Sequence, residues 1–229
     1  MVVRPAFAHS WDVSPTEARK IQCQLRGCVL VEPLDRRPET VAGVDVSVKG
    51  KRARAAVVLC SYSELTPFQA ATAEMPVSFP YVPGLLAFRE GPVVLAALEQ
   101  LKDRPDVLMF DAQGFAHPRR MGLATHLGIL LDMPAVGCAK SRLCGTYVEP
   151  DEHKGSWAPL IEGGDGDKVI GAVVRTRAGV RPVFVSVGHR VDLETAVSLV
   201  LECTTRYRLP EPTRWAHRIA GGASLPLTG

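Results

Sequence analysis

Two aspartates stand in apolar surroundings that do not favour a charged side chain. Asp45 interrupts the apolar stretch "AGVDVSV", and Asp111 follows the apolar run "DVLMF" and precedes Gly114. An unpaired carboxylate in an apolar strand is costly, and two such acids on neighbouring strands repel each other unless a cation lies between them. Mg²⁺ suits this position because it prefers carboxylate oxygens and keeps several water ligands. The alternative is that each acid pairs with a nearby arginine or caps a turn.

Glu90 is a third acid that could join this chemistry. It ends the segment "GLLAFRE", where a helix would direct its carboxylate toward the same cleft. A glutamate exposed on a helix surface is the alternative, because glutamate is mostly an exposed residue type. Spacing alone does not decide between the two interpretations.

Basic residues gather beside these segments. The formal net charge of +3 says little about partners. The distribution of the charge is more informative, because clustered cations favour a polyanionic partner such as nucleic acid. Solvated loop charges are the alternative. The basic residues concerned are Lys49, Lys51, Arg52, Arg54, Arg119, Arg120, Lys140 and Arg142.

The first third of the chain predicts a helix followed by three antiparallel strands. Ser14 and Pro15 have the residue types of an N-cap and a first helical position. Lys49 and Gly50 mark the turn of a hairpin, and a meander is the simplest pairing of the three strands. The expected elements are a helix at 14–31 and strands at 40–48, 52–62 and 65–76.

The rest of the chain alternates helices with strands. Apolar residues between 85 and 101 recur at helical spacing, and Gly91-Pro92 is expected to begin a helix or interrupt one. Glycine and charge predict a loop at 149–168, and 219–229 is expected to be a flexible tail. The other expected elements are strands at 106–110, 134–140, 169–176 and 182–188 and helices at 120–131 and 192–207.

This order of elements predicts an α/β fold. We expect a central mixed β-sheet, in which an antiparallel meander is followed by parallel strands, with helices on its faces. No repeat or long linker divides the chain, so a single domain over 1–229 is expected. Polar groups that do chemistry commonly lie at strand ends in such sheets, which suits the position of Asp111.

Composition excludes several other classes of protein. The apolar runs are far shorter than the roughly 20 residues of a membrane-spanning helix, so no membrane partner is expected. The N-terminal segment lacks the apolar core of a secretory signal, which predicts a cytoplasmic location. The six cysteines form no CxxC pair, which favours reduced and mostly buried thiols.

Several longer segments together resemble the endonuclease V family. Similar segments occur in that family in the same order and spacing across residues 40–217, so the match does not depend on one motif. The resemblance implies an RNase H-like fold, with a catalytic region at about 14–218. The segments are "GVDVSV", "MPVSFPYVPGLLAFRE", "FDAQGFAHPRRMGLATHLGILLDMPAVGCAKSRLCG", "VGHRVDLETA" and "YRLPEPTRWAH".

The resemblance implies a DNA repair nuclease. Such an enzyme recognises deaminated adenine, as deoxyinosine in DNA or inosine in RNA, and hydrolyses the second phosphodiester bond 3′ to the lesion. It leaves a 3′-hydroxyl and a 5′-phosphate and uses Mg²⁺, for which Mn²⁺ substitutes. Without the resemblance, His217 would be interpreted as a surface histidine. Matching motifs assign Asp45, Glu90 and Asp111 as metal ligands and catalytic acids, and Lys140 and His217 as further catalytic residues.

The same resemblance assigns three groups of residues to the nucleic acid. A wedge fills the gap in the base stack when the damaged nucleotide turns out, although a rigid surface turn with a packed tyrosine is the alternative. His126 is expected either beside the phosphate and cleft contacts or as a helix-packing residue. The wedge is Pro80, Tyr81, Val82 and Pro83, the lesion pocket is Gly84, Leu86, Ala112 and Leu123, and the phosphate or cleft contacts are His117, Arg119 and Arg120.

One position departs from the family pattern. The chain has "DAQG", with Ala112 where the family usually has the glycine of "DGxG". Alanine adds a methyl group and tolerates positive φ poorly, so the pocket is expected to be narrower. Two alternatives remain for the function: an RNase H-like nuclease acting mainly on inosine-containing RNA or branched DNA, and a protein that binds inosine without cutting. A monomer is expected.

Overall fold

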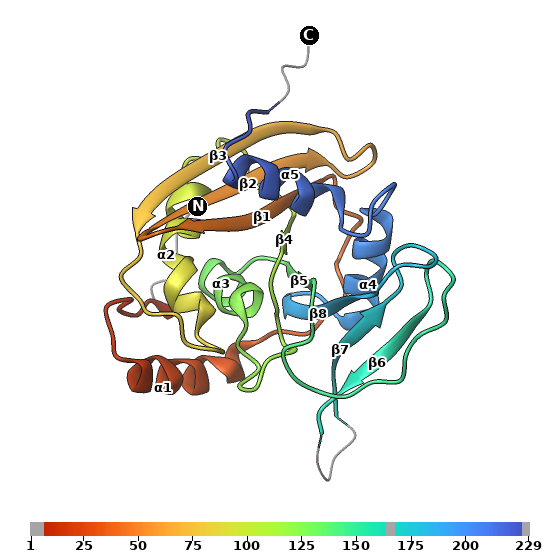
Figure 1. The fold of residues 1–229 in the computed structure, drawn as a ribbon, viewed down its shortest axis with the longest axis horizontal. Coiled ribbons are helices and arrows are strands. Elements are labelled where there is room, and N and C mark those ends of the chain that lie inside the picture. The colour runs from red at the N-terminus through yellow and green to blue at the C-terminus, as the bar shows by residue number, and fades with distance from the viewer. Residues whose placement is uncertain (1–6, 164–167, 226–229) are drawn as a thin grey trace.

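The computed structural model describes residues 7–163 and 168–225, whose strands form one eight-stranded sheet (Figure 1). The strand order is β3-β2-β1-β4-β5-β8-β7-β6. The strands are β1 Thr40–Lys49, β2 Arg52–Ser61, β3 Pro67–Pro76, β4 Val107–Phe110, β5 Ala135–Ala139, β6 Trp157–Ile161, β7 Val169–Val174 and β8 Val183–His189. The helices are α1 Pro15–Leu25, η2 Arg26–Cys28 (a 3₁₀-helix), α2 Leu86–Glu99, α3 Leu123–Leu131, α4 Leu193–Glu202 and α5 Glu211–Ala220.

The first three strands form the predicted antiparallel meander. β1 and β2 pair along their whole length, from Thr40 opposite Ser61 to Lys49 opposite Arg52, and β2 also pairs with β3. Gly50 in the β1–β2 turn has a φ of 59°, a conformation that glycine adopts without strain. The hairpin prediction is confirmed.

The parallel part of the sheet lies at its centre. β4 pairs in parallel with β1, and β5 pairs in parallel with β4. Beyond β5 the pairing is antiparallel again, through β8, β7 and β6. The predicted mixed sheet is therefore confirmed, with parallel pairing limited to β1, β4 and β5. The C-terminal ends of β4 and β5 lie at one edge of this central part, which is where crossover folds commonly place reacting groups.

Different helices cover the two faces of the sheet. On one face, Val44 of β1 belongs to the same buried cluster as Val94 of α2 and Leu127 of α3. On the other face, Val41 belongs to a second cluster with Ala216 of α5 and residues of α4. Because successive strand side chains point to opposite faces, the odd-numbered positions of β1 face α5. Asp45 is one of these positions.

Helix α1 lies apart from the sheet, against the segment that leads into α2. Its N-cap is Ser14, whose hydroxyl accepts from Glu17 N at 3.2 Å, as the sequence predicts. Ala18 and Ile21 pack against Phe79 and other apolar side chains around the start of α2. The helix ends at Leu25 and a short 3₁₀ turn follows, so the predicted helix at 14–31 is too long.

The expectation that Gly91-Pro92 begins a helix or interrupts one is wrong. α2 continues through Pro92, although proline removes one helical hydrogen bond. Burial holds the helix together, because Val93 and Val94 lie in the core and Gly91 packs against Trp11. A Cβ at Gly91 would come within 2.8 Å of the Trp11 ring, so the glycine permits this contact.

Two further elements differ from the predictions. β6 lies inside the segment 149–168 that was expected to be a loop, because it is an edge strand whose pairing with β7 is not visible in a short, proline-containing sequence. α5 includes residues 219 and 220 of the expected tail, of which 226–229 lie outside the described residues, as do 164–167 of the expected loop. Within the part of the chain that is described, no helix has the length and apolar character needed to cross a bilayer.

Candidate active site

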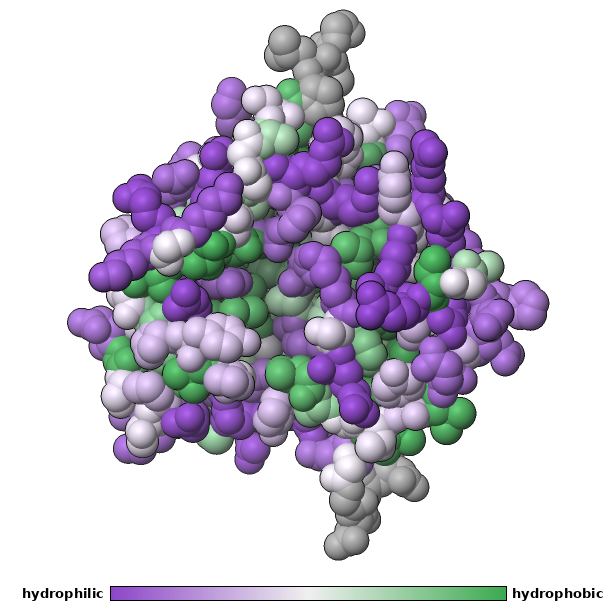
Figure 2. Space-filling model, viewed as in Figure 1, coloured by the Kyte–Doolittle hydropathy of each residue, from purple (hydrophilic) through white to green (hydrophobic). Residues whose placement is uncertain are grey.

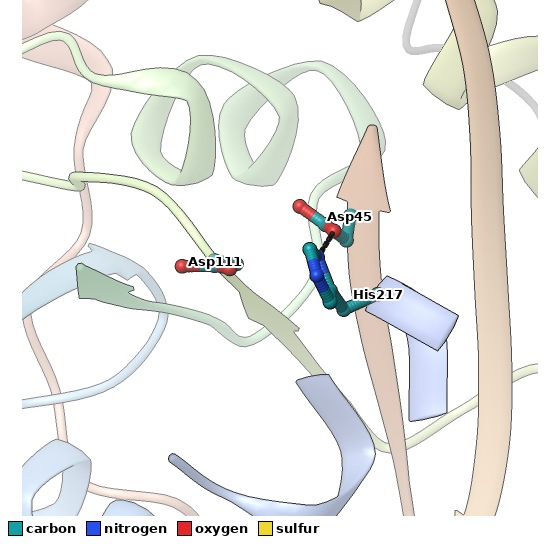
Figure 3. Close-up of side chains that lie close together, drawn as sticks. All are labelled: Asp45, Asp111 and His217. Carbon is teal, nitrogen blue, oxygen red and sulfur yellow. Dashed lines mark hydrogen bonds and ion pairs between the residues drawn. The ribbon is translucent and has the colours of Figure 1, made fainter. Parts of the chain in front are cut away.

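Two carboxylates and an imidazole converge beside the C-terminal end of β4. The parallel register pairs Val44 of β1 with Phe110 of β4, so the next residue on each strand, Asp45 and Asp111, reaches the same level. The Asp111 N–H donates to Val44 O at 3.1 Å, which continues the ladder by one residue. His217 approaches from α5, and ligand atoms of the three side chains lie within 4.8 Å of one another (Figure 3).

Asp45 is held by a hydrogen bond to His217. Its Oδ2 lies 2.7 Å from His217 Nδ1, and its side chain is 13% exposed. Burial raises the pKa of the Asp45 carboxyl, and the nearby Asp111 carboxylate raises it further. The group is therefore a concentration of negative charge that a bound cation would relieve.

Lys140 supplies the positive charge that faces Asp111. It follows β5, the strand next to β4, and its Nζ forms an ion pair with Asp111 Oδ2. The Lys140 side chain is 43% exposed, so the ammonium group is accessible from the cleft as well as to the carboxylate. The structure thus brings together Asp45, Asp111, Lys140 and His217 from four different elements.

Glu90 lies on the wall of the same cleft but outside the three-residue group. It projects from α2, and burial raises the pKa of its carboxyl to about 8, with a further contribution from Asp45. A carboxyl with this pKa shift signals a low-dielectric position close to other negative charge. Its predicted role as a metal ligand stays a prediction.

The group opens into a cleft with a volume of about 450 Å³. The space-filling view is hollowed near the centre of its face, between β1 and α3 (Figure 2). All four predicted pocket residues line the cleft, as do three of the four predicted wedge residues. The lining residues from these two predictions are Gly84, Leu86, Ala112 and Leu123, and Tyr81, Val82 and Pro83.

A model of the endonuclease V family matches residues 23–218, which include Asp45, Glu90, Asp111, Lys140 and His217. The chain belongs to the endonuclease V family. It is 54% identical to an endonuclease V of Methanothrix thermoacetophila over 95% of each chain. The predicted family is confirmed, and the chain is accordingly an endonuclease.

Solved endonuclease V structures share the fold. The Streptomyces avermitilis protein is 45% identical, with a TM-score of 0.87 over 96% of each chain. The Ciona intestinalis protein, in complex with a DNA that contains an inosine followed by a ribo-adenosine, is 29% identical, with a TM-score of 0.78 over 90% of this chain and 95% of that chain. The α/β architecture predicted from the sequence is therefore the architecture of endonuclease V.

The loop of residues 80–84, here called the wedge loop, is anchored through the backbone carbonyl of Gly84, which three side chains contact. Gly84 O accepts from Arg119 Nη2 at 2.7 Å, from His117 Nε2 at 2.9 Å and from Gln22 Nε2 at 3.1 Å. Gly84 has a φ of 78°, and a Cβ there would come within 2.8 Å of Arg119 Nη2. Tyr81, at the other end of the loop, is 73% exposed.

The predicted phosphate contacts have protein partners in this structure. His117 is 2% exposed, and burial together with Arg119 lowers its pKa to about 4. Arg120, at a φ of 60°, forms an ion pair with Glu162 and lies over the Phe115 ring. In this endonuclease V chain, His117 and Arg119 therefore position the wedge loop, and contact of the three residues with phosphate stays a prediction.

Ala112 lies in the cleft wall without backbone strain. It is 7% exposed, and it is not among the described non-glycine residues with positive φ. The backbone at position 112 thus does not require the conformational freedom of glycine, and the Ala112 methyl group lines the cleft. His126 is fully buried against Trp11, Phe88 and His9, so its interpretation as a packing residue is confirmed.

Two residues of the site were not found from the sequence. Gln22 is fully buried on α1, where its amide donates to Met121 O at 3.0 Å as well as to Gly84 O. Gln113 lines the cleft and donates to Ser141 O at 2.8 Å. The available signal for Gln22 was a polar residue on the apolar face of an expected helix, next to Ile21.

Proposed function

We propose that this chain recognises deaminated adenine in nucleic acid and hydrolyses the second phosphodiester bond 3′ to the lesion. The products would carry a 3′-hydroxyl and a 5′-phosphate, and the role would be DNA repair. The observation that carries the proposal is the position of Asp45, Asp111 and His217 beside a cleft that the wedge loop borders. A nuclease that recognises a flipped base needs this combination of a site for chemistry and a recess for the displaced nucleotide.

The donor set of the group fits a divalent metal. Two carboxylates and one imidazole offer oxygen and nitrogen ligands within 4.8 Å of one another, and the carboxylates are partly desolvated. Carboxylate oxygens suit Mg²⁺ and Mn²⁺. Asp45 and Asp111 would hold the ion. His217 offers a further ligand atom within the same group, and Glu90 lies in the wall of the same cleft. When bound, such an ion activates water and stabilises charge on the leaving oxygen.

Lys140 and His217 have roles in the cleft that do not depend on a bound ion. Lys140 places a positive charge next to Asp111, where it would offset the charge of the reacting phosphate. His217 Nδ1 donates to Asp45 Oδ2 at 2.7 Å and so orients that carboxylate. Asp45 belongs to β1 and His217 belongs to α5, so two regular elements hold this hydrogen-bonded pair in place before substrate binds.

The wedge loop suits recognition of an interrupted base stack. Pro80 and Pro83 limit the conformations of the loop, and Tyr81 presents a largely exposed ring. A ring of this kind can stack in the gap that a flipped nucleotide leaves. The cleft behind it, lined by Gly84, Ala112 and backbone groups, would receive the flipped base.

Cleavage of a defined substrate tests the proposal directly. An end-labelled duplex with one deoxyinosine is incubated with Mg²⁺ and the protein, beside an undamaged duplex and the Asp111→Ala variant. We expect a nick one nucleotide beyond the lesion on its 3′ side, absent from both controls. A wild-type protein that binds the lesion tightly in Mg²⁺ without any nick would instead support the alternative of a non-cleaving inosine-binding protein.

Inosine in RNA is the second candidate substrate. The Ciona intestinalis complex contains a ribo-adenosine after the inosine, so a relative accepts a ribonucleotide at that position. Matched deoxyinosine and inosine duplexes, differing only in sugar, are cleaved in direct competition. Preferred cleavage of the deoxyinosine duplex supports DNA repair, and preferred cleavage of the ribose duplex would replace it with an RNA substrate.

A further inference from the structure

The turn of the β1–β2 hairpin is strongly basic and takes no part in the cleft described above. Lys49, Lys51 and Arg52 are exposed around the turn, and Arg54 is partly buried beside it. These four residues are called the hairpin cations below. In the space-filling view, hydrophilic side chains gather at the upper left, over the end of the sheet that carries this hairpin (Figure 2).

The hairpin cations continue the strand face that carries Asp45. Side chains alternate along a strand, so Asp45, Ser47 and Lys49 share one face of β1. Arg54 lies opposite Ser47 on β2, and Arg52 lies opposite Lys49, so both arginines share this face. Four residues of strand span roughly 13 Å, which places Lys49 at that distance from the candidate metal centre.

A hollow of about 190 Å³ lies at the end of this face of β1 and β2. Three of the hairpin cations line it, together with Ser47, Glu74 of β3 and the end of α5 at Ala220 and Gly221. The same helix carries His217 to Asp45, so the hollow opens where α5 ends, directly beyond the metal centre. A strand of nucleic acid leaving the cleft in this direction would meet it.

The positive charge of the hollow is incompletely neutralised. Glu74 is the acid that lines it, and this residue pairs with Arg52 at 3.2 Å and with Arg54 at 3.9 Å. Exposed pairs of this kind are weak, and they compete poorly with a phosphate. The side chains of Arg52 and Arg54 are 62% and 35% exposed, and Lys49 is exposed, so their charged ends are accessible from solvent. Phosphate oxygens match the guanidinium group of arginine, which can donate two parallel hydrogen bonds to them.

We propose that the hairpin cations bind phosphates of the nucleic-acid strand that extends beyond the reacting nucleotides. The inference rests on the proposed function and adds a second surface to it. With a rise of about 3.4 Å per nucleotide along a duplex strand, roughly 13 Å corresponds to about four nucleotides from the reacting phosphate. These contacts carry no base information, so they strengthen damaged and undamaged binding alike.

The salt dependence of binding tests this surface. The Lys49→Ala/Arg52→Ala variant is compared with wild type and with Lys102→Ala/Arg104→Ala, which removes two exposed charges from the loop between α2 and β4. The dissociation constant for a long deoxyinosine duplex is measured against salt concentration without divalent metal. We expect the steepness of the plot of log dissociation constant against log salt concentration to decrease by roughly 1.8 in the hairpin variant, which is about 0.9 for each lost phosphate contact. The control variant should keep the wild-type slope.

Duplex length provides a second readout. Shortening one arm of the duplex to fewer than about four base pairs beyond the lesion should erase the difference between wild type and the hairpin variant. Shortening the other arm should preserve it. The charge-conserving Lys49→Arg/Arg52→Lys variant should keep the wild-type slope, and thermal unfolding of all variants shows whether they are folded.

The outcomes separate the two proposals. A hairpin variant with the wild-type salt slope would overturn the phosphate surface, whatever the cleavage activity. Because the slope is measured without cleavage, failure of the wild-type protein to cut any inosine substrate would contradict the proposed function and leave the slope as an independent result. Equal slope losses in the hairpin variant and the Lys102→Ala/Arg104→Ala control would also overturn it, because the effect would then be net charge alone.

Discussion

The candidate metal centre and the wedge loop border the same cleft but are positioned by different means. Asp45 and Asp111 are placed by the backbone register of two adjacent parallel strands. The wedge loop is placed by side chains, because three of them donate to the single carbonyl of Gly84. A strand register changes only if the sheet changes, whereas a side-chain anchor fails when one donor is lost. Chemistry and recognition should therefore respond separately to substitution.

The largest expected effect comes from the metal centre. Asp111→Ala should lower the rate of cleavage by on the order of 10³-fold or more, because loss of metal-assisted catalysis removes several kcal/mol of transition-state stabilisation. Binding of a deoxyinosine duplex should change little, because the wedge loop is intact. Single-turnover cleavage and binding without divalent metal are measured in parallel. A variant that retains wild-type cleavage would refute the assignment of Asp111.

Tyr81→Ala should show the opposite pattern. The ring is 73% exposed, so its loss should leave thermal stability unchanged. Stacking of a base on an aromatic side chain contributes about 1–3 kcal/mol, so lesion binding should weaken by roughly 5- to 150-fold. Titration with Mn²⁺, followed by calorimetry, should give the wild-type metal affinity. The Tyr81→Phe variant retains the ring and should bind as wild type does; equally weak binding by both variants would contradict stacking.

Gln22→Leu tests the side-chain anchor itself. The substitution removes the hydrogen bonds to Gly84 O and Met121 O and the acceptor for Arg119 Nε at 2.6 Å, leaving buried polar atoms without partners. We expect a loss of about 2 kcal/mol in the free energy of unfolding. We also expect a higher KM for the deoxyinosine duplex with a nearly unchanged kcat.

A control separates lost stability from lost positioning in this variant. Val200→Ala truncates a fully buried side chain on α4, far from the cleft in the fold, and should cost a similar amount of stability. Its KM should stay at the wild-type value. If both variants raise KM equally, the effect of Gln22 is one of stability and the anchor interpretation is wrong.

The last expected effect lies farthest from the chemistry and is a pH dependence of stability that comes from two buried histidines near the wedge loop. Burial lowers the pKa of His126 to about 3 and that of His117 to about 4, both below the unfolded value of about 6.5. Above about pH 6.5 both imidazoles are neutral in the folded and in the unfolded protein, so their titration does not change the free energy of unfolding. As the pH falls toward 4, the unfolded state binds more protons, so stability should fall by up to about 1.4 kcal/mol per pH unit for each imidazole.

Urea unfolding between pH 7 and pH 5 measures this effect. His126→Phe should give a flatter dependence than wild type, because one of these two imidazoles with a lowered pKa is absent. His153 is exposed, and His153→Gln should keep the wild-type slope. Equal slopes for wild type and His126→Phe would show that this imidazole is not held neutral by the fold.

Much of the fold follows from local patterns in the sequence. The meander, the Ser14 N-cap and the short apolar strand before Asp111 are each set by residue type and alternation within a few positions, and the structure confirms them. These are short-range signals, so a single sequence carries them.

Other features depend on contacts that no local pattern contains. α2 passes through Pro92 because the core holds it, and β6 exists because β7 lies beside it. His217 was placed by family resemblance alone, since a histidine on an exposed helix face has no local signal for a ligand. Gln22, 62 residues from Gly84 in the chain, became visible as an anchor only in the folded protein.

The sequence by itself determined the chemistry available to this protein: two acids in apolar strands, a rigid loop with one tyrosine and a set of clustered cations. Tertiary structure alone decided which of these groups meet. It brought His217 to Asp45, turned His117 and Arg119 inward to Gly84, and left the hairpin cations exposed beyond α5. The physical reason is that alternation and capping act over a few residues, whereas hydrogen bonds and charges act between whichever elements the core packs together.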